Sequence, residues 1–444
     1  MRHQGRSLER HQGGRGKGRW LGALLLWTSV ACATPPRAQQ PGRAPARNAF
    51  RPGVTVLLDD SLQLIAGRRI ALVTNHTGVD LEGTSIVDLL RADPRVKRAN
   101  VTLVRLFSPE HGIRGDKDVT DLPDELDARS GLMVHSLYRR ETMGPPDSLL
   151  RDLDGLVFDL QDIGTRTWTY VGVMVYSMRA AARAGIPFVV LDRPNPLGGR
   201  AEGLLLDSAL ANPEDPTPAR RGQAYALYPH PLRHGMTNGE LARWFAADLK
   251  IPVQLSVVRM SGYRRSMWWE ETGLPWTVPS PSMATTASAL LYPALVPFEG
   301  SNLSVGRGTS LPFQQFGASW LDARRVAREL EERGLGGVRF EAVRFTPERP
   351  GDAKFAGREI PGVRIVIEDR ERVQSARIGA ALLWAIARAA PDSLKLNARS
   401  FDLRLGASWA REALLRGDDP DEVIDRVQPD LVAFQRRVRP YLLY

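Results

Sequence analysis

The sequence contains a single cysteine, Cys32, among its 444 residues, and this scarcity excludes an internal disulfide. Three common catalytic signatures are also missing. The chain has no G-x-x-x-x-G-K-[ST] phosphate loop, no G-x-G-x-x-G after its first expected strand and no H-E-x-x-H zinc motif. Neither nucleotide binding nor zinc-dependent hydrolysis therefore has a motif to support it, and the chain shows no internal repeat.

The folded part also lacks an excess of positive charge, although the whole chain carries a net charge of +10. Residues 1–52 hold ten Lys or Arg and one acidic residue, which accounts for +9 and leaves +1 for the other 392 residues. A nucleic-acid groove needs basic residues in the folded domain, so no nucleic-acid partner is expected. Hydrophobic content of 43% and charged content of 25% are those of a globular protein.

The basic N-terminus is typical of an export signal. Basic residues precede an apolar stretch at 20–33 that is too short for an ordinary transmembrane helix. Ala31-Cys32-Ala33 fits a cleavage site, and Cys32 also resembles a lipidation site, although Ser29 stands where Leu is usual. Cleavage after Ala33 and lipidation at Cys32 both stay open. We expect a signal peptide at 1–33, a flexible linker at 34–52, and a periplasmic or extracellular protein.

Four apolar runs each lead directly into a polar cluster. Buried parallel strands read as short continuous apolar runs, and ligands bind at the carboxyl ends of such strands in open α/β sheets. The clusters therefore predict one active site, rich in carboxylates, at one edge of a sheet. The runs with their clusters occupy residues 70–76, 104–112, 156–162 and 187–196.

Strand and helix patterns alternate between residues 54 and 252, which predicts α/β architecture with a doubly wound parallel sheet. Helices are expected at 84–92, 170–184 and 241–249, the last opened by a capping box of Thr237 and Glu240.

A Pro- and Trp-rich segment at 263–297 predicts irregular backbone. Strands at 338–345 and 362–368 and a helix at 376–389 predict a smaller α/β domain after it. The aromatic residues of the Pro- and Trp-rich segment are either platforms for sugar rings or ordinary core residues.

Glu110 is the leading catalytic candidate. It follows Pro109, which blocks helix continuation, and it precedes Gly112, which permits unusual backbone angles. A carboxylate fixed at a strand end suits general acid catalysis. The alternative is a loop carboxylate that pairs with Arg114.

The remaining clusters supply binding candidates. Asp159 and Asp162 suit a cation or sugar hydroxyls, unless Asp162 caps a helix that begins near Thr165. For His76 and His111 a hydrogen-bonding role is favoured over metal ligation, because no ligand spacing supports a metal.

Two further loops add polar candidates. Asp192, Arg193 and Asn195 lie on a turn fixed by two prolines. A glycine-rich loop at 298–309 carries Glu299, Asn302 and Arg307, and we expect it to face the first domain.

Six segments together resemble the exo-β-N-acetylmuramidases of the NamZ type, glycoside hydrolase family 171, from about residue 54 to residue 444. They lie at 74–78, 107–112, 158–166, 191–196, 233–237 and 299–309. The resemblance implies a Rossmann-like domain at 53–282 and a smaller α/β domain at 283–444 that closes the cleft. It also implies release of N-acetylmuramic acid from the non-reducing end of peptidoglycan fragments, in cell-wall recycling.

The predicted site combines these residues. The catalytic candidates are Glu110 and Glu299, and the substrate-binding candidates are Asn75, His76, His111, Asp159, Asp162, Arg166, Asp192, Arg193, Asn195, Asn302 and Arg307. The three arginines are candidates to pair with the lactyl carboxylate of the sugar. No cofactor or metal is expected, the expected partners are muropeptides or disaccharides, and any membrane contact is through a lipid anchor. The alternatives are a metal-dependent hydrolase built on His76, His111, Asp159 and Asp162, and a non-catalytic peptidoglycan-binding lipoprotein.

Overall fold

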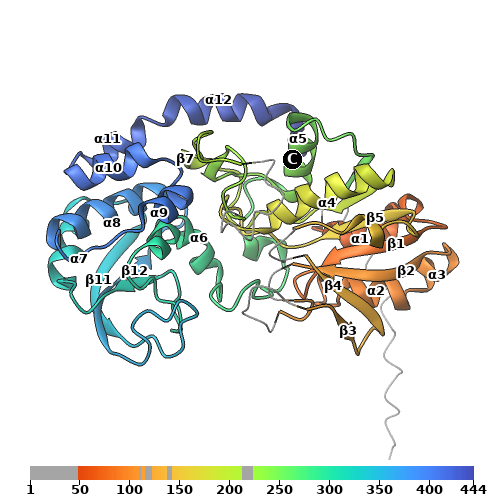
Figure 1. The fold of residues 1–444 in the computed structure, drawn as a ribbon, viewed down its shortest axis with the longest axis horizontal. Coiled ribbons are helices and arrows are strands. Elements are labelled where there is room, and N and C mark those ends of the chain that lie inside the picture. The colour runs from red at the N-terminus through yellow and green to blue at the C-terminus, as the bar shows by residue number, and fades with distance from the viewer. Residues whose placement is uncertain (1–48, 110–111, 116–122, 138–142, 213–223) are drawn as a thin grey trace, which may run out of the picture. The chain divides into compact units, whose positions relative to one another are not determined.

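The fold is taken from a computed structural model that describes residues 49–109, 112–115, 123–137, 143–212 and 224–444 (Figure 1). Glu110, His111 and Cys32 lie outside the described residues, so the statements that concern them stay predictions. Residues 49–444 belong to one compact unit, and the predicted division at 282/283 remains a prediction.

The described residues form a seven-stranded sheet in the order β3-β4-β2-β1-β5-β6-β9. All neighbouring pairs are parallel except β3, which runs antiparallel to β4 at the edge. The four strands predicted from the apolar runs are confirmed, and they are consecutive neighbours at the centre of the sheet. The strands are β1 (Arg69–Thr74), β2 (Thr102–Ser108), β3 (Glu125–Asp127), β4 (Leu132–Ser136), β5 (Gly155–Asp159), β6 (Phe188–Leu191) and β9 (Leu255–Val258).

The interiors of β1, β5 and β6 are continuous apolar runs because helices cover both faces of the sheet. Side chains alternate between faces along a strand. Ala71 and Val73 of β1 accordingly join the core formed with α4 (Tyr170–Ala184) and α5 (Asn238–Asp248). Ile70 and Leu72 join the opposite core, formed with α1 (Gly53–Asp60), α2 (Ile86–Ala92) and α3 (Pro94–Arg98). The predicted doubly wound α/β architecture is confirmed.

Local signals set the helix bounds. The helix predicted at 170–184 has those bounds, and it ends at Gly185 in a left-handed conformation. The predicted capping box is present: the Thr237 hydroxyl accepts from the Glu240 amide, and the Glu240 carboxylate accepts from the Thr237 amide at 3.0 Å. The helix therefore begins at Asn238, three residues before the predicted start.

The smaller C-terminal α/β region is also confirmed. Its antiparallel sheet has the order β10-β12-β11, and helices pack against it (Figure 1). A two-stranded ribbon of β7 and β8 packs against α8 and α12. These strands are β7 (Glu202–Leu205), β8 (Pro231–Arg233), β10 (Gln315–Gly317), β11 (Val338–Phe345) and β12 (Ile360–Ile367). The helices are α6 (Thr286–Leu295), α7 (Ala323–Glu332), α8 (Ser375–Ala389), α9 (Ala398–Leu405), α10 (Ser408–Arg416), α11 (Pro420–Asp425) and α12 (Gln428–Val438).

The prediction of irregular backbone throughout 263–297 is wrong for its last third, where α6 forms. Thr285 caps this helix by accepting from the Ser288 amide at 3.1 Å. Residues Ser288 to Leu295 of α6 are all buried, and the Ser375 hydroxyl of α8 donates to the Leu290 carbonyl. Packing against α8 thus outweighs the disruption from Pro293 in its last turn.

No helix within the described ranges is both long enough and apolar enough to cross a lipid bilayer.

Candidate active site

The carboxyl ends of β1 and β5 mark the point where the strand order reverses. From β1 the chain proceeds to β2 and β4 on one side, and later to β5, β6 and β9 on the other. The Thr74 hydroxyl donates to the Asp159 carbonyl at 2.7 Å, and the Gln161 amide donates to the Thr77 hydroxyl at 3.0 Å. Ligand sites of open α/β sheets lie at such switch points, and the predicted clusters after β1, β5 and β6 meet there.

Asn75 holds the loop after β1 in place. Its side chain donates to the Tyr170 hydroxyl at 2.9 Å and accepts from the amide and hydroxyl of Thr77. The amide is buried, so its hydrogen-bonding capacity serves the backbone and α4.

Asp159 and Arg193 form a buried ion pair across the ends of β5 and β6. Asp159 is fully buried and Arg193 is 2% exposed. The pair is bidentate, with one contact of 2.8 Å between Arg193 Nη2 and Asp159 Oδ2. Arg193 Nη2 also donates to the Val79 carbonyl at 2.9 Å. The geometry satisfies both charges internally, as a buried pair requires.

Asp162 and Asn195 shape the loops after β5 and β6. Asp162 Oδ1 accepts from the Gly164 amide at 2.6 Å, whereas α4 is preceded by Thr169, so Asp162 does not cap that helix. The Asn195 side chain donates to the Met236 carbonyl and accepts from the Leu197 amide. Both side chains line one small pocket.

His234 is a site residue that sequence reasoning did not select. Its Nε2 lies 3.6 Å from Asp162 Oδ1, and it is almost fully buried. Among the described residues, His234 Nε2, Asp162 Oδ2 and Gln161 Oε1 have no hydrogen-bond partner. The only signal for His234 was its place in the segment 233–237 that carries the family resemblance.

Asp192 anchors the C-terminus. Its carboxylate accepts from the Gly239 amide at 2.8 Å and from the hydroxyls of Thr237 and Tyr444, each at 2.8 Å. A Cβ on Gly239 would lie 2.8 Å from Asp192 Cγ, so glycine permits the close approach. Burial raises the pKa of Asp192 to about 7, and the Glu240 carboxylate adds to the increase.

Arg166 connects the first domain to the C-terminal region. Its guanidinium donates to the carbonyls of Leu403 and Arg404, at 3.0 and 2.9 Å. Burial lowers the pKa of Arg166 to about 9. The side chain is 3% exposed, and its two terminal nitrogens already bind backbone.

Glu299 lies between two guanidinium groups. Its Oε1 accepts from Arg307 Nε at 2.8 Å, and its Oε2 accepts from Arg404 Nε at 3.3 Å. Burial acts to raise the pKa of Glu299, but Arg307 and Arg404 outweigh it and hold the pKa below its ordinary value. Glu299 is therefore ionised at neutral pH, which suits a base or nucleophile and not a general acid.

A segment at 276–283 ties the sheet edge to the Glu299 cluster. His76 Nε2 contacts the Val278 carbonyl at 2.7 Å, and the Tyr170 hydroxyl donates to the Pro279 carbonyl at 3.2 Å. Arg307 Nη1 donates to the Ser282 hydroxyl at 3.0 Å. The structure thus brings the strand-end loops and the glycine-rich loop together through this bridging segment (276–283).

The Asn302 side chain forms its hydrogen bonds outside the Glu299 cluster. Its side chain donates to the Ser393 carbonyl and accepts from the Lys395 amide, both at 2.9 Å. These bonds fix the loop before α9.

Arg114, the alternative partner suggested for Glu110, binds another carboxylate. Its guanidinium makes three contacts of 2.7 to 3.0 Å with Asp127. Hydrogen bonds to Ser130 and Arg114 offset burial and lower the pKa of Asp127.

Across the described part of the chain, no group of three or more His, Cys, Asp and Glu side chains is arranged to hold a metal ion. Of the four residues of the metal-hydrolase alternative, Asp159 is paired with Arg193 and His111 lies outside the described residues.

Comparisons with known proteins identify similar chains. The N-terminal family model of the exo-β-N-acetylmuramidase NamZ matches residues 70–287, and its C-terminal model matches residues 290–444. The chain is 36% identical over 430 residues to the peptidoglycan β-N-acetylmuramidase NamZ of Bacillus subtilis. That alignment covers 96% of this chain and 98% of the relative.

Two crystal structures of DUF1343 family proteins from Bacteroides fragilis have similar folds. One superimposes with a TM-score of 0.78 at 32% identity, and covers 90% of this chain and 100% of the other. The second has a TM-score of 0.68 at 26% identity, and covers 89% and 99%.

The Asp159–Arg193 pair yields the first prediction. Arg193→Met leaves a buried carboxylate without its partner and should lower the free energy of unfolding by about 3–5 kcal/mol. Arg193→Met combined with Asp159→Leu should recover most of that loss, because it removes both charges. Urea unfolding followed by circular dichroism measures both effects. A fully stable Arg193→Met protein that has lost substrate affinity would instead assign Arg193 to substrate binding.

Asp192 yields a prediction on pH. Its folded-state pKa of about 7 exceeds the ordinary 3.8, so its contribution to stability is present below pH 3.8 and is lost as pH rises through 7. The loss is on the order of 4 kcal/mol at most, from three pKa units. Asp192→Asn should therefore flatten the decline of the melting temperature between pH 4 and pH 7. Asp392→Asn, at an exposed position, is the control, and parallel profiles for wild type and Asp192→Asn would contradict the assignment.

Proposed function

Because the chain belongs to the NamZ family of exo-β-N-acetylmuramidases, we propose that it is a glycoside hydrolase that releases terminal N-acetylmuramic acid from peptidoglycan fragments. The observation that carries this proposal is the match of two consecutive family models to residues 70–287 and 290–444. The resemblance inferred from six short segments is confirmed by the same matches. The natural substrates are then peptidoglycan-derived disaccharides or muropeptides.

The proposed catalytic roles divide between two carboxylates. Glu110 is the general acid, on the grounds of its place in the sequence at the end of β2. Glu299 is the second carboxylate, and its lowered pKa supports an ionised role as base or nucleophile. Arg307 and Arg404 hold it in that state.

A substrate-assisted route needs only one of these groups. The N-acetyl group of the sugar then supplies the nucleophile, as in the known exceptions to the two-carboxylate pattern. In that route Glu110 still protonates the leaving oxygen, and Glu299 stabilises positive charge and orients Arg307.

Arg307 is the arginine best suited to the lactyl carboxylate of the substrate. Of the three predicted candidates, Arg166 and Arg193 are nearly fully buried and bound to protein acceptors. The Arg307 side chain is 22% exposed, next to the bridging segment. An exo-acting enzyme needs a wall that stops the chain at one sugar, and the bridging segment is the proposed wall.

The test of function compares two chromogenic glycosides. The purified protein should hydrolyse the β-glycoside of N-acetylmuramic acid, and should leave the matching glycoside of N-acetylglucosamine almost untouched. Binding of muropeptides without release of sugar would favour the non-catalytic alternative. Activity that is lost with a chelator and restored by a divalent ion would favour the metal-dependent alternative.

Glu110→Gln tests the proposed acid. General acid catalysis contributes about 10²–10⁴-fold in rate, so kcat should fall by at least that range while the melting temperature stays close to that of the wild type. Glu82→Gln removes an exposed carboxylate from the same domain and is the matched control. Near-normal turnover by folded Glu110→Gln protein would remove Glu110 from the mechanism.

We also propose that the chain is exported, and two forms of the mature protein are compatible with its N-terminus. Cleavage after Ala33 gives a chain that begins at Thr34, and lipidation gives an acylated Cys32 as the first residue. Mass spectrometry of the protein from its source cells distinguishes them, because only the second carries an acyl mass. An intact segment 1–33 in those cells would contradict export.

A further inference from the structure

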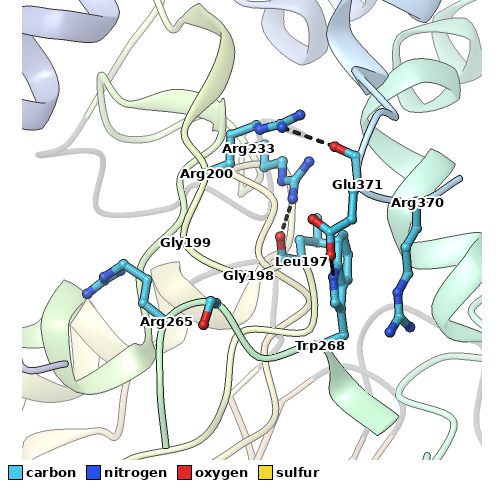
Figure 2. A pocket seen from close by; sticks show the side chains of 10 residues that line it. Leu197, Gly198, Gly199, Arg200, Arg233, Arg265, Trp268, Arg370 and Glu371 are labelled. Carbon is cyan, nitrogen blue, oxygen red and sulfur yellow. Dashed lines mark hydrogen bonds between the residues drawn. The ribbon is translucent and has the colours of Figure 1, made fainter. Parts of the chain in front are cut away.

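A pocket of about 450 Å³ lies outside the predicted active-site residues (Figure 2). It is lined by residues after β6, by the segment that begins at Arg265, and by the turn before α8, so segments from both family-model regions contribute. Its size falls in the range of pockets that bind small molecules. The lining residues are Leu197, Gly198, Gly199, Arg200, Arg233, Arg265, Ser266, Trp268, Arg370 and Glu371.

Four guanidinium groups and one carboxylate form the charged part of this lining. Three of the arginines are balanced by carboxylates that do not line the pocket: Arg233 by Glu202, Arg265 by Glu240, and Arg370 by Glu270. The one lining carboxylate, Glu371, accepts from the Trp268 indole. The lining side chains alone carry four positive charges and one negative charge, and three of the positive charges are balanced from outside the pocket.

Of the four lining arginines, Arg200 is the one that has no carboxylate partner among the described residues. Its guanidinium donates to the carbonyls of Val373 and Glu371, at 3.3 and 3.1 Å. Figure 2 shows this side chain extending toward the Glu371 backbone beside Arg233. A guanidinium held by carbonyls keeps its full charge and retains free donors for an anion.

Arg233 provides a second, independent observation. It is 3% exposed, and its Nε has no hydrogen-bond partner within the described structure. Burial lowers the pKa of Arg233, and the positive charge of Arg200 adds to that effect against the pull of Glu202. A bound anion would relieve both penalties, since it offers an acceptor and an opposite charge.

The remaining lining residues include Trp268 and two glycines. Arg370 stacks over the Trp268 ring at 4.8 Å from its centroid. A Cβ on Gly199 would lie 1.9 Å from Arg265 Cγ, so glycine at this position lets the Arg265 stem pack against the backbone.

We propose that this pocket is a second binding site that takes a carboxylate-bearing ligand through Arg200 and Arg233. Two sources carry that chemistry, a short acidic peptide and an acidic sugar. The carboxylate chemistry rests on the pocket alone, and the assignment of the ligand to a peptidoglycan fragment rests on the proposed function. An enzyme that holds the terminal sugar in its active site would use such a pocket to hold another part of the same fragment.

Isothermal titration of the full chain tests the proposal. The probes are N-acetyl-L-alanyl-D-glutamate, N-acetylmuramic acid, N-acetylglucosamine as the uncharged sugar, and inorganic phosphate. Arg200→Gln should weaken binding of the responsible carboxylate at least about tenfold, because one charge-assisted contact is lost. Arg436→Gln removes an equally exposed charge from α12 and should change nothing.

If Arg200→Gln weakens the affinity for the peptide alone, the pocket is assigned to peptide carboxylates. If it weakens the affinity for N-acetylmuramic acid alone, the pocket is assigned to the acidic sugar. Unchanged affinity for both, or binding of phosphate but of neither carboxylate, overturns the proposal. Arg370→Gln serves as a second variant if Arg200→Gln is unfolded, because the Arg370 partner, Glu270, is exposed. Hydrolysis of the chromogenic glycoside by the same preparation is scored separately. Failure there refutes the proposed function and leaves the binding result standing.

Discussion

The ion pair of Asp159 and Arg193 is the contact on which the arrangement of the sheet edge depends. Removing two charges from water costs several kcal/mol for each ion, and only good geometry with further hydrogen bonds compensates. Here the carboxylate receives two guanidinium donors and the guanidinium also reaches the Val79 carbonyl. The pair therefore joins the ends of β5 and β6 to the loop after β1. The loops after β1, β5 and β6 meet at that junction.

Several of the predicted substrate ligands form hydrogen bonds within the protein. The Asn75 side chain accepts a hydrogen bond from its own loop. Arg166 donates to the backbone carbonyls of Leu403 and Arg404, and Asn302 accepts from the loop before α9. Polar side chains buried at a strand edge must be satisfied, and neighbouring backbone is the nearest source of partners. A polar cluster in a sequence therefore marks the edge where a site forms without identifying the groups that touch substrate.

The strands and main helices could be predicted because their signals are local. Four apolar runs became four neighbouring strands, and the helix at 170–184 was found at its true bounds. The roles of the polar residues depend on partners far apart in the chain. Arg193 and Asp159 are separated by 34 residues, and Tyr444 and Asp192 by 252. No local pattern reports such pairs, and the same holds for α6, whose burial against α8 is a tertiary contact.

The charge balance around Glu299 connects this packing to the proposed selectivity. One carboxylate is shared by Arg307 and Arg404, so the cluster has one positive charge in excess. That excess keeps the pKa of Glu299 low despite burial, and it leaves the surroundings favourable to a further anion. Lys354, which donates to the Glu299 carbonyl, is balanced by Asp352 and adds little to the excess. Under the proposed function, the carboxylate that distinguishes N-acetylmuramic acid from N-acetylglucosamine would supply the missing negative charge. A neutral sugar would leave the second guanidinium uncompensated in a partly desolvated site, so discrimination would arise from the same cluster that keeps Glu299 ionised.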